Sequence, residues 1–302
     1  MIISIGDIYN FTELDIRKLK KEELIYIEDD NSAIFKIKKK LRDNRKGIYI
    51  ILNQYHISLS LRNFLKEINN NAHVETLFID EFLEKYLNKI YLDHNFMKYI
   101  YKDIKPFSKV QYFQKRTIDY LIIFPLVILS SPIIFYSIIK IQKESPDDSP
   151  MFYQIRIKKN NKPFICFKFR SMRTDINFFN HYTQDNDPRI FNYGKFMRKT
   201  RIDELPQIIN VIKGDMHIVG PRAEWYQLVK KYLKVYPCYK IRHIVNPGIT
   251  GWAQIHYPYG RDLKDTKQKL MYDLYYIKNW SLWLEIKIIV KTIWIMFRAK
   301  GL

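Results

Sequence analysis

The chain has 302 residues, and 47% of them are hydrophobic, which provides enough apolar material for a packed core and excludes global disorder. Only two cysteines occur, Cys166 and Cys238, so a disulfide-rich scaffold and a cysteine-based zinc site are excluded as well. The formal charge of +20 predicts an anionic partner, which is a nucleic acid, an anionic membrane surface or a phosphorylated substrate.

The first 110 residues are predicted to form a small soluble α/β region. They hold 19 Lys and Arg against 16 Asp and Glu, whereas residues 111–302 hold 32 against 15, so the anion-seeking charge lies in the second part. Residues 48–52 and 74–79 have the composition of strands, and a predicted helix follows each of them. Neither strand is followed by a glycine-rich phosphate loop, so we predict no nucleotide site in this region.

The next feature is an apolar stretch of 22 residues, Ile118 to Ile139, in which Asp119 is the only charged residue. As a helix it would be about 33 Å long, enough to cross a bilayer core. Pro125 and Pro132 interrupt it, and the hydroxyl of Ser131 favours a bend there. Basic residues on both flanks favour two cytoplasmic ends. A spanning helix and a re-entrant helix therefore both remain open, and a buried core helix fits least.

The C-terminal stretch from Trp280 to Phe297 mixes aliphatic and aromatic residues with Lys287 and Lys291. This composition is typical of an amphipathic helix that lies in the membrane interface and is attracted to anionic headgroups. An amphipathic helix packed on the core of its own domain would show the same pattern, so both interpretations remain open.

The densest polar cluster lies between these two apolar stretches. Asp203 and Glu204 are adjacent carboxylates at the predicted start of a helix, because Pro206 is tolerated only in a first turn. Such a position attracts anions and keeps a carboxylate ionised, able to act as a nucleophile or to bind Mg²⁺. An N-capping acid pair with solvated basic neighbours would fit the same local pattern. The basic residues around the pair are Arg189, Arg198, Lys199, Arg201 and Arg222.

A series of short motifs runs from about Gln114 to Gly301. The motifs are Lys115-Arg116-Thr117-Ile118-Asp119, Ser131-Pro132, Pro150-Met151-Phe152-Tyr153-Gln154, Lys168-Phe169-Arg170-Ser171-Met172, Asp187-Pro188-Arg189, Asp203-Glu204-Leu205-Pro206-Gln207, Gly220-Pro221-Arg222, Arg242-His243, Pro247-Gly248-Ile249-Thr250-Gly251-Trp252-Ala253-Gln254 and Tyr272-Asp273-Leu274-Tyr275-Tyr276-Ile277-Lys278-Asn279. Their order resembles the bacterial sugar transferases, the monotopic polyprenol-phosphate phosphoglycosyl transferases that initiate glycan assembly. The chain departs from the family pattern at Lys158, where Gly is frequent, at His217, where Ser is, and at Glu285, where many relatives have Asp.

The resemblance implies an α+β fold with a membrane-associated catalytic domain over residues 111–302. It implies a re-entrant helix over about residues 115–141, broken at Ser131 and Pro132, and interfacial amphipathic helices. The protein is accordingly expected on the cytoplasmic face of a bacterial inner membrane. The small soluble α/β region over residues 1–110 is expected to be regulatory or to form a homodimer.

The resemblance also implies a reaction. A sugar 1-phosphate is expected to pass from a UDP-sugar to polyprenyl (undecaprenyl) phosphate with release of UMP. The reaction goes through a covalent phospho-sugar intermediate on Asp203. Asp203 is also expected to bind the Mg²⁺ cofactor. Glu204 is expected to be its catalytic partner. Candidate substrate-binding residues are Lys168, Arg170, Arg189, Arg201, Arg222 and Arg261. The sugar, the isoprenoid length and the glycan pathway do not follow from the sequence.

A basic module without catalytic activity is the alternative, bound to a membrane or to a nucleic acid. It would explain the charge of +20. It would explain neither an acidic pair surrounded by arginines nor a proline-broken apolar helix. We therefore expect anionic membrane lipids, and not nucleic acid, among the partners.

Overall fold

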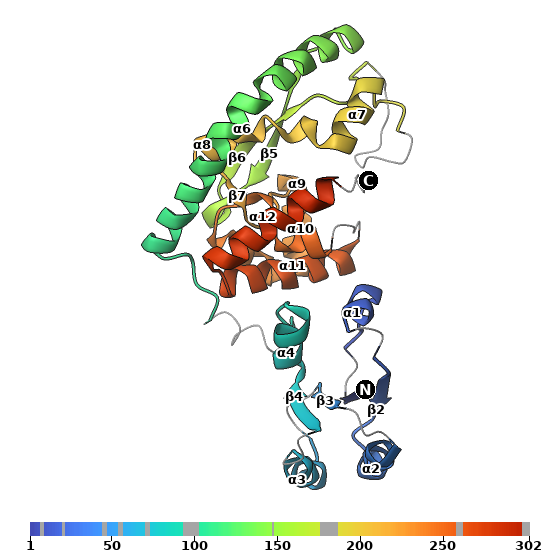
Figure 1. Cartoon of the computed structure of the whole chain (residues 1–302). Coiled ribbons are helices and arrows are strands. Elements are labelled where there is room, and N and C mark those ends of the chain that lie inside the picture. Colours follow the sequence, from blue (N-terminus) through green and yellow to red (C-terminus); the bar gives the residue numbers. More distant parts are fainter. Residues whose placement is uncertain are drawn as a thin grey trace. The chain divides into compact units, whose positions relative to one another are not determined.

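The computed structural model describes residues 1–6, 9–19, 22–43, 47–53, 57–69, 73–92, 103–146, 148–175, 187–257 and 262–297 (Figure 1). Its chain divides into two compact units, Met1–Asp93 and His94–Leu302. Each unit is described by itself below.

The N-terminal unit is built on a sheet of four parallel strands in the order β2-β1-β3-β4. The strands are β1 (Ile2–Ile5), β2 (Leu24–Ile27), β3 (Ile48–Leu52) and β4 (Val74–Phe78), and the helices are α1 (Glu13–Lys18), α2 (Ala33–Asp43), α3 (Leu59–Ile68) and α4 (Ile79–Phe82), continued by the π-helical turn η1 (Leu83–Leu87). The helices supply the crossovers that parallel pairing requires. β3 and β4 confirm the two strands predicted from the sequence, whereas β1 and β2 were not predicted.

The C-terminal unit is mainly helical and carries two small sheets. Its elements are α6 (Lys109–Glu144), β5 (Met151–Ile157), η2 (Lys159–Asn161), β6 (Pro163–Phe169), α7 (Asn192–Thr200), η3 (Ile202–Glu204), α8 (Gln207–Ile212), β7 (His217–Val219), α9 (Tyr226–Val235), η4 (Pro237–Ile244), β8 (Gly248–Thr250), α10 (Trp252–His256), α11 (Leu263–Lys278) and α12 (Leu282–Phe297). β5 and β6 form an antiparallel hairpin, and β7 pairs with β8 in parallel. The two units together form a mixed α/β protein.

Helix α6 contains the predicted apolar stretch and is, within the described ranges, the one helix long and apolar enough to cross a membrane. It continues through Pro125 and Pro132. The hydroxyl of Ser131 donates a hydrogen bond to the carbonyl of Ile128 at 2.8 Å. In a regular helix residue 132 would donate to this carbonyl, but Pro132 has no N–H. The polar group freed by the proline is thus satisfied inside the helix, as an apolar surrounding requires.

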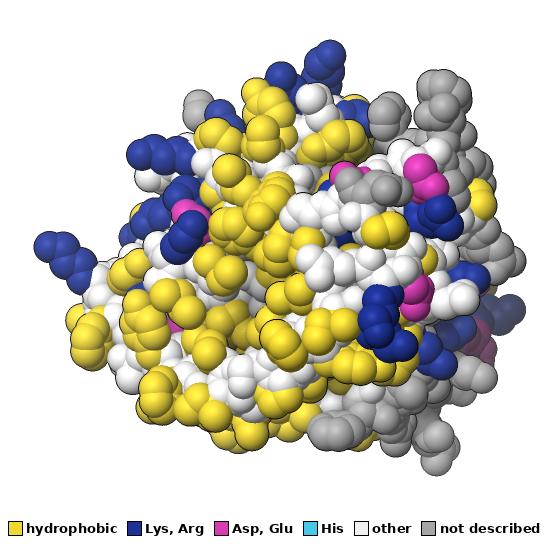
Figure 2. Space-filling view, turned by 90° about the horizontal axis from the view of Figure 1, so that it is seen from above, with side chains coloured by type: hydrophobic (Ala, Val, Ile, Leu, Met, Phe, Trp, Pro, Cys, Tyr) yellow, Lys and Arg dark blue, Asp and Glu magenta, His cyan; other side chains and the backbone are white. Residues whose placement is uncertain are grey.

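Most of the apolar side chains of α6 are exposed, including Leu121, Phe124 and Leu129 at 70%, 72% and 73%. Figure 2 shows the molecule from above, relative to Figure 1. On this face hydrophobic side chains cover a broad central part of the surface, and Lys and Arg side chains lie around it. An apolar surface of this extent is typical of a membrane-associated protein. Whether the helix is broken at Ser131-Pro132 within a bilayer stays a prediction.

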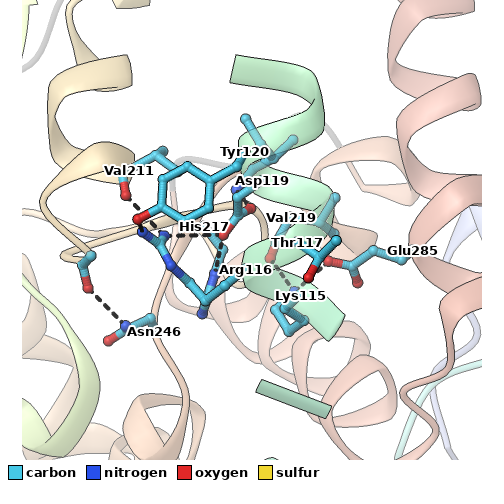
Figure 3. A network of polar contacts seen from close by, with 12 residues as sticks. Lys115, Arg116, Thr117, Asp119, Tyr120, Val211, His217, Val219, Asn246 and Glu285 are labelled. Atoms are coloured by element: carbon cyan, nitrogen blue, oxygen red, sulfur yellow. Dashed lines mark hydrogen bonds and ion pairs between the residues drawn. The ribbon is translucent and has the colours of Figure 1, made fainter. Parts of the chain in front are cut away.

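The first turns of α6 are fixed to the rest of the unit by a buried lysine (Figure 3). Lys115 forms an ion pair with Glu285 of α12, and neither side chain is more than 1% exposed. The Lys115 amine also donates to the carbonyl of Val219 at 2.9 Å and to the hydroxyl of Tyr276 at 2.7 Å. The Trp280 indole donates to the second oxygen of Glu285 at 2.9 Å. One cation therefore joins α6, β7, α11 and α12.

One turn further along α6, Asp119 fixes the same helix to β7 (Figure 3). Its Oδ1 accepts the backbone N–H of Ile218 at 2.8 Å, and its Oδ2 lies 2.6 Å from Nδ1 of His217. Arg116 donates to Asp119 at 3.2 Å and to the carbonyl of Val211, at the end of α8, at 2.9 Å. The charged residues of the motif Lys115–Asp119 therefore fix α6 to the rest of the unit, and His217 contacts this motif through Asp119.

His243 is buried on η4, where its Nδ1 lies 2.7 Å from Oδ1 of Asn161. Burial, with a smaller effect from the neighbouring positive charge of Arg242, lowers the pKa of His243 to about 3. The ring is therefore neutral in the folded protein at neutral pH.

Replacing Lys115 by Met should lower the free energy of unfolding by about 3–5 kcal/mol, because it leaves the buried Glu285 carboxylate without a counter-charge. Chemical denaturation in detergent would measure this. The double variant Lys115→Met/Glu285→Leu should recover most of the loss, since an apolar pair of similar volume costs little. A single variant as stable as the wild type would contradict the anchoring role.

Acidification should destabilise the protein through His243. Between its ordinary pKa of 6.5 and its folded pKa of about 3, the ring binds a proton in the unfolded chain only, so the free energy of unfolding falls as the pH falls. The slope from this group is up to about 1.4 kcal/mol per pH unit. His243→Gln should flatten the dependence of denaturation midpoints on pH between 6 and 4, whereas His73→Gln, at an exposed site, should not. Equal slopes in all three proteins would contradict the assignment.

Candidate active site

Asp203 and Glu204 lie on η3, a single 3-10 turn between α7 and α8. The sequence predicts that a helix starts at this acidic pair. In the structure α8 starts about one turn later, at Gln207 after Pro206. Arg201 ends α7 with a φ of 62°, in the left-handed region that a residue with a Cβ rarely adopts. This reversal turns the chain sharply and presents the two carboxylates on a short turn instead of within a helix.

Glu204 is buried and already paired. Its Oε1 lies 2.7 Å from Nζ of Lys168 and 3.4 Å from Nη2 of Arg222. Burial alone would raise the pKa of Glu204, but the charges of Lys168 and Arg222 outweigh it and hold the pKa well below its ordinary value. Burial in turn lowers the pKa of Lys168, and Glu204 opposes that effect. Glu204 therefore stays ionised and holds two cations beside its neighbour.

Asp203 has a carboxylate oxygen, Oδ1, that is buried and accepts no hydrogen bond from the described residues. Burial raises the pKa of Asp203, and the positive charge of Lys168 opposes this. Leaving a buried acceptor unsatisfied costs roughly 1–3 kcal/mol. The unsatisfied oxygen beside a cluster of cations therefore marks the point where a ligand is expected.

The donor set fits Mg²⁺ only as a cation shared with a substrate. No group of three or more His, Cys, Asp or Glu side chains is close enough to hold a metal within the ranges that the structure describes. Mg²⁺ commonly binds through one or two carboxylates together with substrate phosphates. The unpaired Oδ1 of Asp203 provides one such ligand, whereas Glu204 is occupied by Lys168 and Arg222.

Lys168 reaches Glu204 because β6 and α8 are joined by one buried amide. The side chain of Asn210 on α8 donates to the carbonyl of Ile165 at 2.7 Å and accepts the N–H of Phe167 at 3.0 Å. Ile165 and Phe167 lie three positions and one position before Lys168 on β6, so these two bonds set how β6 lies against the turn that carries Glu204. The sequence analysis did not identify Asn210.

Arg222 is held in place through its backbone by two further arginines. Arg242 donates to the carbonyl of Arg222 at 2.8 Å, and Arg156 donates to the carbonyl of Ala223 at 2.6 Å. Arg242 is itself fixed by a buried ion pair with Asp273 at 2.7 Å, and Gln154 accepts two bonds from Arg156. Sequence reasoning did not assign these roles, although Gln154, Arg242 and Asp273 all lie in motifs that it singled out.

Two glycines allow the loop that carries Arg222 to lie directly against its neighbour. A Cβ on Gly248 would lie 2.0 Å from the backbone nitrogen of Gly220, and a Cβ on Gly220 would lie 2.7 Å from that of Gly248. These distances are too short for any side chain, so the backbones touch. The motifs Gly220-Pro221-Arg222 and Pro247-Gly248 thus pack against each other through their backbones.

Two of the other predicted substrate-binding arginines pair with carboxylates other than Asp203 and Glu204. Arg170 pairs with Asp148 at 2.9 Å, and Arg189 pairs with Asp187 at 2.7 Å. The side chain of Arg201 is exposed, and its positive charge is one of those that oppose the rise in the pKa of Asp203 caused by burial. Substrate binding by these three stays a prediction. Arg261 lies outside the described residues.

The chain is similar to one known family and to several of its members. The model of the family described as bacterial sugar transferase matches residues 110–299. A UDP-N-acetylgalactosamine-undecaprenyl-phosphate N-acetylgalactosaminephosphotransferase of Aeromonas hydrophila is 40% identical over 223 residues, which are 74% of this chain and 52% of that protein. A UDP-glucose:undecaprenyl-phosphate glucose-1-phosphate transferase of Escherichia coli is 38% identical over 200 residues, 65% of this chain and 43% of that protein.

A third relative is shorter. The uncharacterised sugar transferase EpsL of Bacillus subtilis is 36% identical over 190 residues, which are 62% of this chain and 89% of that protein. The chain thus spans about half the length of the first two relatives and most of the third. Because the family model covers well over half of the chain, including the whole of the candidate site, this protein belongs to the bacterial sugar transferase family.

Proposed function

We propose that this protein transfers a sugar 1-phosphate from a UDP-sugar to polyprenyl phosphate and releases UMP, as the first membrane step of polysaccharide or glycoconjugate assembly. The observation that carries the proposal is the buried, unsatisfied Oδ1 of Asp203 beside the Lys168–Glu204–Arg222 cluster. The names of two relatives, which specify undecaprenyl phosphate with UDP-N-acetylgalactosamine and with UDP-glucose, support the same substrate classes.

The reaction proceeds in two displacements at one phosphorus atom. The ionised carboxylate of Asp203 attacks the β-phosphorus of the UDP-sugar, and the bond from this phosphorus to the bridging oxygen breaks. UMP leaves with the bonding electrons, and a phospho-sugar remains as an acyl phosphate on Asp203. A phosphate oxygen of the polyprenyl phosphate then attacks the same phosphorus, forms the diphosphate link and restores the carboxylate.

The cations around Asp203 make the approach of two anions feasible. A carboxylate and a diphosphate repel each other, and the repulsion is strong in a partly buried site. Lys168 and Arg222 offset it, and Glu204 keeps both at fixed positions before the substrate arrives, which avoids reorganisation during the reaction. Mg²⁺, when held by Asp203 and the diphosphate oxygens, would supply further neutralisation of phosphate charge.

The membrane arrangement is part of the proposal. Residues 111–302 form the catalytic domain, α6 enters and leaves the cytoplasmic leaflet of the inner membrane, and Ser131-Pro132 lies at its deepest point. The exposed apolar side chains of α6 and the basic residues at both ends support this placement. The phosphate of a lipid acceptor lies at headgroup level, so the site has to be held there. The N-terminal unit would be regulatory or dimerising.

Asp203→Asn should lower transfer by at least about 1,000-fold, because the isosteric amide is no nucleophile. UMP release from UDP-sugars, with polyprenyl phosphate present, measures turnover, and a panel of UDP-hexoses and UDP-N-acetylhexosamines would identify the donor. Intact mass spectrometry of the wild type with UDP-sugar alone should show a gain of one hexose phosphate, which the variant lacks. Asp30→Asn, in the N-terminal unit, serves as the matched control. Full turnover by Asp203→Asn would refute the nucleophile.

A topology test separates the re-entrant helix from a spanning one. Lys109→Cys and Lys143→Cys each place a thiol at one exposed end of α6, and the native Cys166 and Cys238 are buried. A membrane-impermeant maleimide should label neither variant in intact cells and both after permeabilisation. Labelling of one end only in intact cells would show that α6 spans the membrane.

A further inference from the structure

The hairpin of β5 and β6 (Figure 1) has two faces of different character, because successive side chains of a strand point to opposite sides. The odd-numbered residues of both strands are all apolar or aromatic, and Tyr153, Ile155 and Ile165 among them are exposed. The even-numbered residues form the other face, which carries Arg156 and Lys168. These two side chains hold the Arg222 loop and Glu204, so the even-numbered face is the one that belongs to the candidate active site.

This face is covered along most of its length and opens at one end. Its pairs of directly opposite residues follow one another along the hairpin, and in the first two pairs Phe164 and Cys166 are buried. In the third pair Phe152 lies directly opposite Lys168, and Phe152 is 43% exposed. The Cβ atoms of directly opposite residues are about 5 Å apart. An exposed aromatic ring therefore lies beside the lysine of the site.

The ring of Phe152 is close to the place where the reacting phosphorus would lie. The amine of Lys168 lies 2.7 Å from Glu204, and Glu204 directly follows Asp203. In a UDP-sugar, the sugar is joined to the β-phosphorus by a single oxygen, whereas the α-phosphate and the ribose separate the uracil from it. The part of the donor nearest to Phe152 is therefore the sugar.

We propose that Phe152 is the platform on which the sugar of the UDP-sugar lies, with Lys168 binding the adjacent phosphate. This inference rests on the proposed function and names a residue that selects the sugar. The face of an aromatic ring is electron-rich, so it attracts the weakly positive C–H groups on one side of a hexose. A lipid contact would favour the odd-numbered face, which is apolar throughout, over the face that Phe152 shares with Lys168.

The test measures binding without turnover, by isothermal titration calorimetry of the full-length Asp203→Asn protein in detergent. The ligands are UMP and the UDP-sugar that the donor panel selects. Adding Phe152→Ala should raise the dissociation constant of the UDP-sugar about 10-fold, because one aromatic contact is lost, and should leave that of UMP unchanged. Phe152→Trp should retain the affinity. With Asp203 intact, Phe152→Ala should raise KM for the UDP-sugar more than it lowers kcat.

Tyr153→Ala serves as the matched control, because Tyr153 is the next residue, is 55% exposed and lies on the opposite face. This variant should bind both ligands as its parent does. Unchanged UDP-sugar affinity in Phe152→Ala, or an equal loss in Tyr153→Ala, would overturn the platform. An equal loss of affinity for UMP and for the UDP-sugar would show that the ring holds the uridine and would overturn the sugar assignment.

Failure of the platform differs from failure of the proposed function. If the proposed function is wrong, the wild type itself releases no UMP and forms no hexose-phosphate adduct. If only the platform is wrong, the wild type does both, and Phe152→Ala matches its affinity and its KM.

Discussion

A buried ion pair holds together the two helices that expose the most apolar surface. Lys115 of α6 and Glu285 of α12 are withdrawn from water, and the Lys115 amine also binds the carbonyl of Val219 on β7. Removing two charges from water is expensive, and the ion pair offsets the cost together with the hydrogen bonds with Val219, Tyr276 and Trp280. The pair therefore fixes the positions of α6, β7 and α12 relative to one another. The other elements of the C-terminal unit pack around these three.

The candidate site follows from this placement through backbone contacts. β7 ends directly before Gly220, whose backbone touches Gly248, and the next two residues lead to Arg222. Arg222 meets Glu204, which lies beside Asp203 on the turn between α7 and α8. A short series of contacts thus connects α6 to the two carboxylates. The close backbone contact between Gly220 and Gly248 lies on this path, which suits a site that must hold charge in a fixed geometry.

Much of this arrangement could be predicted from the sequence, and the missing part has a common physical cause. The apolar stretch of α6, the strands β3 and β4 and the acidic pair are local patterns, and each was visible in a short window. The role of Asn210 and the pairing of Arg242 with Asp273 join residues far apart along the chain. A short stretch of sequence does not show which basic residue pairs with which acidic residue elsewhere in the chain. The helix start near Asp203 was misplaced by one turn because the left-handed Arg201 carries no sequence signal.

The separation of Lys115 and Glu285 by 170 positions also dictates an order of assembly. During synthesis α6 leaves the ribosome long before α12 exists, so Lys115 is first without its counter-charge and stays hydrated. The anchor closes only when the final helix arrives and takes the lysine out of water. Nascent chains that stop short of residue 285 would lack this ion pair, and their α6 would not be fixed to the rest of the unit.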